Sequence, residues 1–474
     1  MGARAASSAL ALSLVLVACS RNAATGRLQF LLPSDDEEIQ LGRDADADVR
    51  VAMPPYTEQK AATALVVEVG RSLAAVSERP ELPWQYTLLD DPQVNAFALP
   101  GGFVYVTRGL LAHLENTDEL AAVLAHETAH VTARHGVVQL RKQATARRSV
   151  GIFRVIDPNL RHIGGLAART AGLALLAYSR EDENEADDLA IRYVQAGGYH
   201  REALVRVFEV LTALERKGGD QTPPWLSTHP DPADRQRRTA AALSIAATVP
   251  VRPQAEYLQA IDGLAFGEDP RDGYMLGETF VHPRSGFELV LPPQWKAFHD
   301  REQVVAVSPD ERALFVALPT KFSDRARALT DFFVGGEITA GERIEGKVGG
   351  FPVSSQSFAL LDDNGAKLMG LVAFVDFDGV VMAMVAIGPE QGWSERADVL
   401  ARSFGSFGRI AERGRAEVQP ARIDVIALPR AMTVQDAARE LGGITSADGL
   451  ALLNGVALDA ALPEGYLLKQ VKAP

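Results

Sequence analysis

A short stretch of the chain, HETAH from His126 to His130, has residue types and spacing that suit metal chemistry. Its two histidines are four residues apart, so on a helix their imidazoles lie on one face and can bind the same metal ion. Glu127 follows the first histidine and can reach a water molecule bound to that metal. Two ligands, a general base and an open position for water are the layout of a zinc hydrolase.

Flanking signals predict that this stretch lies within one helix. Asn116 suits the N-cap position, and Glu119 follows three residues later, as in a capping box. Gly136 stands where the helix would end, and Arg134 and His135 would place positive charge in its last turn. A chance match on a surface helix with two solvated histidines is the alternative. The capping signals and the apolar residues before the histidines argue against it.

A zinc site needs a third ligand. One class of zinc peptidase uses a histidine six residues after the second histidine of the motif, and that position is occupied here by Gly136. His135 is one residue out of register for that arrangement, so a third histidine from the same segment is excluded. A carboxylate from a later helix is therefore expected.

The acidic run from Ser179 to Asp188 is the richest source of such a carboxylate. A glutamate ligand gains from a second acid one turn later, which can accept the other ring N–H of a ligand histidine. Two pairs have this spacing, namely Glu183 with Asp187 and Glu181 with Glu185. A solvated acidic helix is the usual meaning of such a run, and it remains the alternative.

The N-terminus has the pattern of an export signal. A short apolar run ends in LVAC at Cys19, which resembles the lipobox of bacterial lipoproteins. The resemblance implies cleavage before Cys19 and a lipid on that residue, and Ser20 resembles the signal for transfer to an outer membrane. Cys19 is the only cysteine, which favours lipidation over an incidental thiol in a secretory signal. We predict a signal peptide over 1–18, a tether over 19–33 and a periplasm-facing location.

Length and charge narrow the possible functions. The chain has 474 residues, enough for two to four domains, and its net charge is −13. A nucleic-acid-binding protein would show a basic face, so nucleic acid is excluded as a partner.

Residues 34–265 are predicted to form a mainly helical domain with a small sheet around HETAH. Trp84–Leu89 and Phe103–Val106 have strand composition, and PGG at 100–102 predicts a hairpin within Val94–Leu110. The edge of the strand at 103–106 could pair with an extended substrate peptide and hold it across the metal. An interior strand with both edges covered is the alternative.

The rest of the chain is predicted to form two further units, which makes the whole chain α+β. Residues 274–412 alternate strand and helix patterns, and GFELVLPPQW within them resembles a PsbP or Mog-type fold. Residues 420–472 resemble the second half of a LysM module, which binds peptidoglycan. The usual G-D-T start of that module is replaced by RAMT at 430–433. Glycan binding and a role in packing both stay open for this unit.

Four motifs in the expected order resemble one peptidase family. They are NAFALPGG, HETAH, SREDENEADDLA and STHP, the last with Arg235 six residues after its histidine. Together they resemble the gluzincin family of the CAAX prenyl protease and HtpX, and within it an exported bacterial branch that includes BepA and LoiP. The resemblance covers about 28–246 and implies a zinc metalloendopeptidase.

The resemblance implies one Zn²⁺ per chain, bound by His126, His130 and Glu183. It implies that Glu127 is the general base and later the proton donor. The reaction would then need no nucleophilic side chain.

The resemblance also implies roles around the metal. Asp187 would orient a zinc-bound histidine, and Arg235 would support that region. His229 would either stabilise the oxyanion or cap the metal in a closed resting form. Asn95 would belong to the segment that lines the substrate cleft.

Two functions follow as hypotheses. The first is a lipid-anchored endopeptidase at the outer membrane that acts on misfolded or unassembled envelope proteins. The second is a chaperone-like or peptidoglycan-associated binding lipoprotein whose metal site is largely closed.

Overall fold

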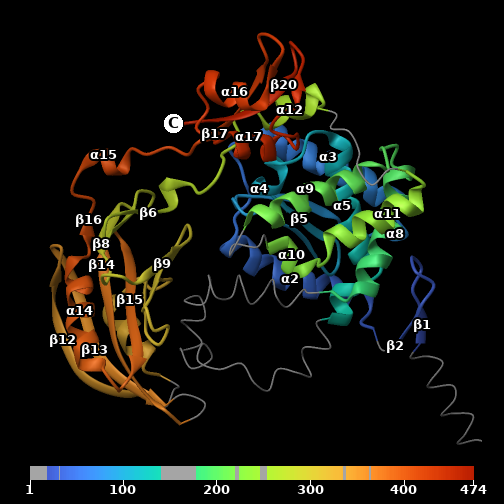
Figure 1. The fold of residues 1–474 in the computed structure, drawn as a ribbon. Coiled ribbons are helices and arrows are strands. Elements are labelled where there is room, and N and C mark those ends of the chain that lie inside the picture. The colour runs from blue at the N-terminus through green and yellow to red at the C-terminus, as the bar shows by residue number, and fades with distance from the viewer. Residues whose placement is uncertain are drawn as a thin grey trace, which may run out of the picture. The chain divides into compact units, whose positions relative to one another are not determined.

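The computed structural model (Figure 1) describes residues 19–30, 32–139, 178–218, 224–245, 253–334, 338–361 and 365–474. These residues form two compact units. The first contains the described residues up to 139, those from 178 to 268, and those from 421 to 474; the second contains 269–420. The predicted signal peptide, 1–18, lies outside the described residues. Among the described helices, none has the length and apolar character needed to span a bilayer.

The segment predicted to be a tether has structure of its own. Strand β1 (Cys19–Arg21) pairs antiparallel with β2 (Leu28–Phe30). Between them the buried Asn22 donates a hydrogen bond from its side chain to the carbonyl oxygen of Thr132, at 3.0 Å. This β1–β2 hairpin is therefore attached to the end of the helix that carries HETAH, which differs from the predicted tether.

A three-stranded sheet lies beside that helix. Its strands are β3 (Gln85–Leu89), β4 (Ala96–Leu99) and β5 (Phe103–Thr107), in the order β3-β5-β4. The predicted hairpin is present, since β4 and β5 are antiparallel and Gly101 and Gly102 between them have positive φ angles of 80° and 100°. However, β5 is the central strand. The prediction that a substrate could pair with the strand at 103–106 is wrong, because both edges of that strand are already paired.

Helices complete the first unit outside its C-terminal segment, and those that the structure describes from end to end are given next. They are α2 (Asp35–Ala52), α3 (Lys60–Val76), α4 (Arg108–Ala112), α5 (Thr117–Thr132), α8 (Arg180–Ala196), α9 (Ala203–Gly218), α10 (Pro224–Thr228), α11 (Pro232–Leu243) and α12 (Ala255–Ile261). Helix α5 packs against α3, α8 and α9, and every residue from Glu119 to Thr132 is buried. The helix that carries HETAH is thus the centre of this unit, not a surface helix.

The sequence predicted the first residue of α5 correctly but not its last. Asn116 is the N-cap, and its side chain accepts a hydrogen bond from the backbone N–H of Glu119 at 2.8 Å. The helix ends at Thr132, so the prediction that Gly136 ends it is wrong. The left-handed residue is Arg134, with φ 63°. Its guanidinium binds Glu38 at 2.7 Å, a long-range contact that local sequence does not reveal.

The C-terminal segment completes the first unit. It contains β17 (Arg422–Ala427), β18 (Met432–Thr433), α16 (Val434–Glu440), α17 (Ala447–Leu453), β19 (Ala461–Leu462) and β20 (Leu467–Lys472). Strand β17 pairs antiparallel with β20, and β18 with β19. Ile423 and Val471, on the paired strands, are buried in the same core as Tyr257 and Ile261 of α12. Most other buried apolar side chains of residues 421–474 form a small core of their own, so this segment joins the core of the helices only along the β17–β20 side.

The second unit is an α+β domain inserted into the first. Its large antiparallel sheet has the order β12-β13-β14-β15-β11-β10-β9, and a smaller one has the order β16-β8-β7-β6. The strands are β6 (Tyr274–Leu276), β7 (Thr279–His282), β8 (Phe287–Val290), β9 (Lys296–His299), β10 (Val304–Val307), β11 (Leu314–Pro319), β12 (Thr339–Val348), β13 (Phe351–Leu361), β14 (Lys367–Phe377), β15 (Val380–Pro389) and β16 (Gly408–Arg409). The helices are η3 (Pro270–Asp272), α13 (Arg325–Phe332), α14 (Trp393–Ser406) and α15 (Arg413–Ala416). The predicted α+β class of the chain is confirmed.

The two ends of this insertion meet in the first unit. The backbone N–H of Phe266 donates to the carbonyl of Ala421, and the N–H of Ile423 donates to the carbonyl of Leu264, both at 2.8 Å. The chain thus leaves the first unit and returns to it at adjacent positions. This order differs from the predicted succession of three domains, because sequence periodicity identifies elements without showing which of them share a core.

Candidate metal centre

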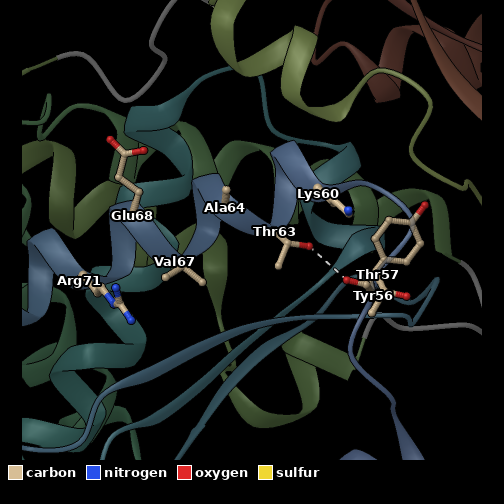
Figure 2. A pocket seen from close by; sticks show the side chains of 8 residues that line it. All are labelled: Tyr56, Thr57, Lys60, Thr63, Ala64, Val67, Glu68 and Arg71. Atoms are coloured by element: carbon tan, nitrogen blue, oxygen red, sulfur yellow. Dashed lines mark hydrogen bonds between the residues drawn. The ribbon is translucent and has the colours of Figure 1, made fainter.

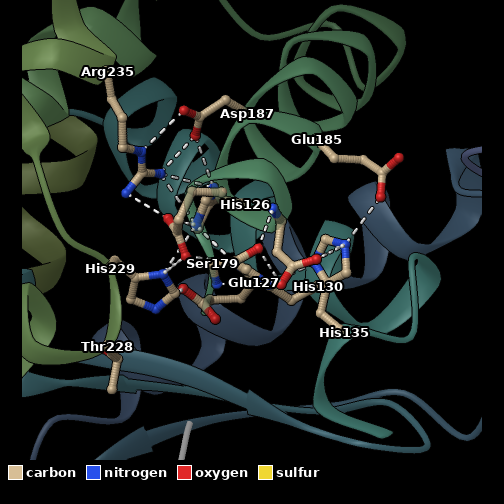
Figure 3. Close-up of polar contacts among 12 residues, drawn as sticks. His126, Glu127, His130, His135, Ser179, Glu185, Asp187, Thr228, His229 and Arg235 are labelled. Atoms are coloured by element: carbon tan, nitrogen blue, oxygen red, sulfur yellow. Dashed lines mark hydrogen bonds and ion pairs between the residues drawn. The ribbon is translucent and has the colours of Figure 1, made fainter. Parts of the chain in front are cut away.

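Three elements of the first unit bring the candidate ligands together. Helix α5 supplies His126 and His130, and His229 follows directly after α10 (Figure 3). Helix α8 supplies Glu183. One ligand atom from each of these four side chains lies within 4.8 Å of those of the other three, and all four side chains are buried. The sequence-predicted ligands are therefore close in space, although about 100 residues separate the first from the last.

The distances describe a compact donor set. Nε2 of His126 lies 3.0 Å from Nε2 of His130 and 3.3 Å from Nδ1 of His229. The Glu183 carboxylate lies 2.9 Å from Nδ1 of His229 and 3.5 Å from Nε2 of both His126 and His130. Three imidazoles and one carboxylate are the ligands that zinc prefers in proteins.

Unsatisfied polar atoms support a metal at this place. Both carboxylate oxygens of Glu127 and Nε2 of His229 are buried and have no hydrogen-bond partner among the described residues. Nε2 of His229 lies 3.6 Å from the nearer Glu127 oxygen, too far for a hydrogen bond. Buried polar groups without partners are costly, so their concentration here fits a site that takes a cation and a water molecule.

A carboxylate and a guanidinium stand behind His126. Its Nδ1 lies 3.0 Å from Asp187, which follows Glu183 by one turn of α8. Arg235 of α11 contacts both acids, since it binds Asp187 at 2.6 Å and 3.0 Å and Glu183 at 2.7 Å. Arg235 also lies over the ring of Phe208, 4.6 Å from its centroid. The acidic run from Ser179 to Asp188 contains two pairs with the expected spacing. The structure places Glu183 and Asp187, and not the other pair, beside the ligand histidines.

The sequence reasoning missed two residues behind His130. Nδ1 of His135 lies 3.0 Å from Nδ1 of His130, and Nε2 of His135 lies 3.1 Å from Glu185. The ring of Tyr178 stacks on His130, with centroids 4.0 Å apart. His135 had been considered as a charge at the helix end and, out of register, as a ligand, but not as a partner of His130. Its place five residues after a ligand histidine, next to a helix end, was the signal that could have found it.

The buried charges shift one another's protonation. Burial and the charge of Arg235 lower the pKa of His126, but the Asp187 and Glu183 carboxylates, which accept its hydrogen bonds, outweigh both and raise that pKa to about 9. Burial, assisted by the charge of His126, lowers the pKa of His130 well below its usual value. Burial raises the pKa of Glu127, which suits a general base that works near neutral pH. Burial alone would raise the pKa of Glu183, but the positive charge of Arg235 together with the contacts from His126 and His229 holds it well below its usual range.

Two other predicted residues lie outside this cluster. Asn95 is buried directly before β4, where its backbone N–H donates to the Thr107 hydroxyl at 3.1 Å. Its side-chain oxygen has no hydrogen-bond partner among the described residues. Cys19 begins β1 and is the first residue that the structure describes.

A separate groove runs along the exposed side of α3 (Figure 2). Its walls are formed by Tyr56, Thr57, Lys60, Thr63, Ala64, Val67, Glu68 and Arg71. None of these residues is a candidate ligand or base, so the groove and the metal centre are different features.

Comparison with known proteins places the centre in a family context. The model of peptidase family M48 matches residues 60–242, which contain all the candidate ligands. The chain is 32% identical over 214 residues to the putative beta-barrel assembly-enhancing protease of Vibrio cholerae, covering 42% of this chain and 43% of that protein. It is 33% identical over 220 residues to the mitochondrial metalloendopeptidase OMA1 of Schizosaccharomyces pombe, covering 45% of this chain and 63% of that protein. The chain thus spans less than two thirds of these curated relatives.

Solved structures give weaker likenesses. PsbP from Synechocystis covers 29% of this chain at a TM-score of 0.24 and 10% identity. The Ran-binding protein Mog1p of Saccharomyces cerevisiae covers 28% at a TM-score of 0.21 and 12% identity. At such scores, the PsbP or Mog-type fold of residues 274–412 stays a prediction.

Proposed function

Because residues 60–242 form a domain of peptidase family M48, we propose that this protein is a zinc-dependent metalloendopeptidase that hydrolyses peptide bonds in other proteins. The observation that carries the proposal is the cluster of His126, His130, Glu183 and His229, with the unpartnered carboxylate of Glu127 beside it. The family match and the names of the relatives support the same activity.

The residues present fit the ion that the activity requires. His126, His130 and Glu183 would hold zinc, which when bound acts as a Lewis acid and makes water more acidic. Glu127 accepts the proton of the attacking water and passes it to the leaving amine. Asp187 and Arg235 hold His126 and Glu183 in place through the contacts described above.

His229 is proposed to close the centre in a resting form and to act on the oxyanion once it turns away. Its Nδ1 lies among the ligand atoms, so four side chains, not three, surround the centre. A catalytic zinc site keeps one position for water, so with zinc bound by His126, His130 and Glu183 the His229 side chain would have to turn away from the centre to admit that water. Once displaced, its imidazole could donate a hydrogen bond to the oxygen that gains negative charge.

The substrate is proposed to be a polypeptide in extended form. Since β5 is paired on both sides, β4 is the strand that packs against α5 and has an edge without a partner strand among the described residues. All four residues of β4 are buried, so binding along this edge requires covering residues to move. Asn95, immediately before β4, would then lie at the end of the bound peptide.

Location and physiological substrate are also proposed. LVAC at Cys19 supports a lipid anchor on the periplasmic side of the outer membrane, and replacing Cys19 by Ala should release the protein from the membrane fraction. The names of the bacterial relatives refer to β-barrel assembly, which supports a role in quality control of envelope proteins.

The proposed activity is tested with protein that begins at Ser20. Metal content and casein cleavage are measured for wild type, Glu127→Gln and Glu181→Gln, the last being an exposed glutamate of α8 that serves as a matched control. One zinc per chain, with cleavage lost only in Glu127→Gln and after treatment with phenanthroline, supports the proposal. Absence of bound metal overturns it.

A second function, a chaperone-like binding lipoprotein, is supported by the fourth side chain at the centre. It predicts that Glu127→Gln retains biological function.

Glycan binding by residues 420–472 remains a prediction, tested by a peptidoglycan pull-down with and without that segment. In the structure, the side chain of Asn454 forms hydrogen bonds with the backbone of Leu450 and Lys469. These bonds support a packing role for Asn454 in the C-terminal segment.

A further inference from the structure

We propose that His135 and Glu185 form a positioning pair for His130, the counterpart of the Asp187–Arg235 pair that holds His126. The inference rests on the proposed metal site, since it assigns how one of the ligands is oriented. It adds two residues to the centre and connects the centre to the N-terminal β1–β2 hairpin.

The His126 side shows what such a pair does. Nε2 of His126 faces the other ligand atoms, while Nδ1 faces Asp187 at 3.0 Å. An acceptor at Nδ1 fixes the proton on that nitrogen, which leaves the lone pair of Nε2 free for a metal. Arg235 in turn holds Asp187.

The His130 side also ends in a carboxylate and an arginine, with one more imidazole between the ligand and the carboxylate. Its Nε2 faces His126 at 3.0 Å, and its Nδ1 lies 3.0 Å from Nδ1 of His135. Nε2 of His135 lies 3.1 Å from Glu185. One set of protons satisfies every contact: Nδ1–H of His130 donates to Nδ1 of His135, and Nε2–H of His135 donates to the Glu185 carboxylate. In this arrangement Nε2 of His130 carries no proton, as a ligand requires.

The backbone places His135 behind His130, outside the group of four candidate ligands. Arg134, just before it, has the left-handed φ of 63° and is held there by its ion pair with Glu38. A residue other than glycine in this conformation is uncommon and needs surrounding contacts to hold it. Without this turn α5 would continue, and His135 would lie on another face of the helix from His130.

Arg27 extends the chain of contacts to the hairpin. Its Nε lies 3.2 Å from the second oxygen of Glu185. The same hairpin binds the end of α5 through Asn22 and Thr132. The order Arg27–Glu185–His135–His130 therefore parallels Arg235–Asp187–His126. It differs in exposure, because the side chain of Arg27 is 57% exposed whereas that of Arg235 is 4% exposed.

The test measures metal binding and ligand geometry instead of turnover. Zinc dissociation constants are obtained by competition with a chromophoric chelator, and the visible spectrum of the cobalt(II)-substituted protein reports the ligand field. The variants are His135→Leu, which removes the partner of His130, His135→Gln, whose side-chain oxygen can still accept from Nδ1–H, and Glu185→Ala. Asp188→Ala is the matched control, since Asp188 lies on the same helix and forms an exposed ion pair with Arg238.

We expect His135→Leu and Glu185→Ala to weaken zinc binding about 10- to 100-fold and to shift the cobalt absorption bands. We expect His135→Gln to recover most of the affinity and Asp188→Ala to match wild type. Circular dichroism of the metal-free proteins checks the fold, and Glu185→Ala serves if His135→Leu does not fold.

Affinity within about twofold of wild type and an unchanged cobalt spectrum in Glu185→Ala and in the folded His135 variants would show a purely structural role and overturn the inference. Failure of wild type to bind zinc would instead overturn the proposed function as well. The two failures are therefore distinguishable.

Discussion

Nζ of Lys469 lies 2.8 Å from a carboxylate oxygen of Glu115, and both side chains are fully buried. Lys469 is on β20, near the end of the chain, and Glu115 is the residue before the N-cap of α5. The same ammonium donates to the carbonyl oxygens of Ala112 and Leu114. The last strand of the protein therefore holds the beginning of the helix that carries the candidate metal ligands.

We predict that Lys469→Met destabilises the first unit by up to about 3–5 kcal/mol, because the buried Glu115 carboxyl, whose pKa burial already raises to about 7, loses its partner and must stay charged without it or take up a proton. Urea unfolding measures the effect. The double variant Lys469→Met with Glu115→Gln should recover part of the loss, since it removes the second charge as well. Lys472→Met, on the same strand but with a 54% exposed side chain, is the control and should change stability little. Equal stability of Lys469→Met and Lys472→Met would contradict this account.

Arg235→Lys should weaken zinc binding about tenfold or more, although it keeps the positive charge. The guanidinium contacts Asp187 and Glu183 together, and a single ammonium cannot reproduce that two-sided geometry. Chelator competition measures the affinity. Arg238→Lys on the same helix, where the arginine binds the exposed Asp188, is the matched control. Wild-type affinity in Arg235→Lys would mean that charge alone, without the fork geometry, is sufficient.

His229→Ala should increase cleavage of a short peptide while zinc stays bound. The reason is that the variant leaves three side chains at the centre and frees one position for water. Initial rates with a fluorogenic peptide, together with zinc content, measure the effect. A rate that falls tenfold or more with zinc retained would show instead that the main contribution of His229 is to stabilise the oxyanion.

The stability of the first unit should depend on the protonation of His113. Burial lowers its pKa from 6.5 to about 4, and its Nδ1 contacts the carbonyl oxygen of Gly109 at 2.8 Å. Above pH 6.5 this residue is neutral in both the folded and the unfolded state. Between pH 6.5 and 4 only the unfolded state takes up the proton, so its contribution to stability is lost as the pH falls through this range.

The slope from this single group is at most about 1.4 kcal/mol per pH unit. In His113→Asn the amide can still donate to Gly109, but it does not titrate. The difference in urea midpoint between wild type and this variant should therefore change between pH 6.5 and 4 and be constant above pH 6.5. A difference that is the same at every pH would show that His113 titrates alike in both states.

The local part of the centre could be predicted from the sequence. The four-residue spacing of His126 and His130 puts them on one face of a helix, and the same spacing relates Glu183 to Asp187. The N-cap at Asn116 was equally local. These features depend on contacts within a helical turn or two, which the order of residues largely determines.

Features that depend on distant contacts were missed. The end of α5 depends on Arg134 reaching Glu38, about 100 residues earlier in the chain, and the place of His135 follows from that turn. Both edges of β5 are paired because β3 pairs with it in parallel, although β4 lies between these two strands in the sequence. The role of Lys469 depends on a helix about 350 residues away, so no window of sequence could reveal it.

The meeting of Leu264–Phe266 with Ala421–Ile423 has a consequence for how the gene could tolerate rearrangement. The chain leaves the first unit and returns to it at neighbouring backbone positions. The intervening 152 residues, 269–420, therefore form a domain inserted at one point of the first unit. If the inserted domain were removed, a linker of a few residues could join the two ends of the first unit. The inserted domain could therefore be deleted or replaced by another domain while the first unit stays folded. A stop codon after residue 420 would instead remove β17 and β20 from the first unit.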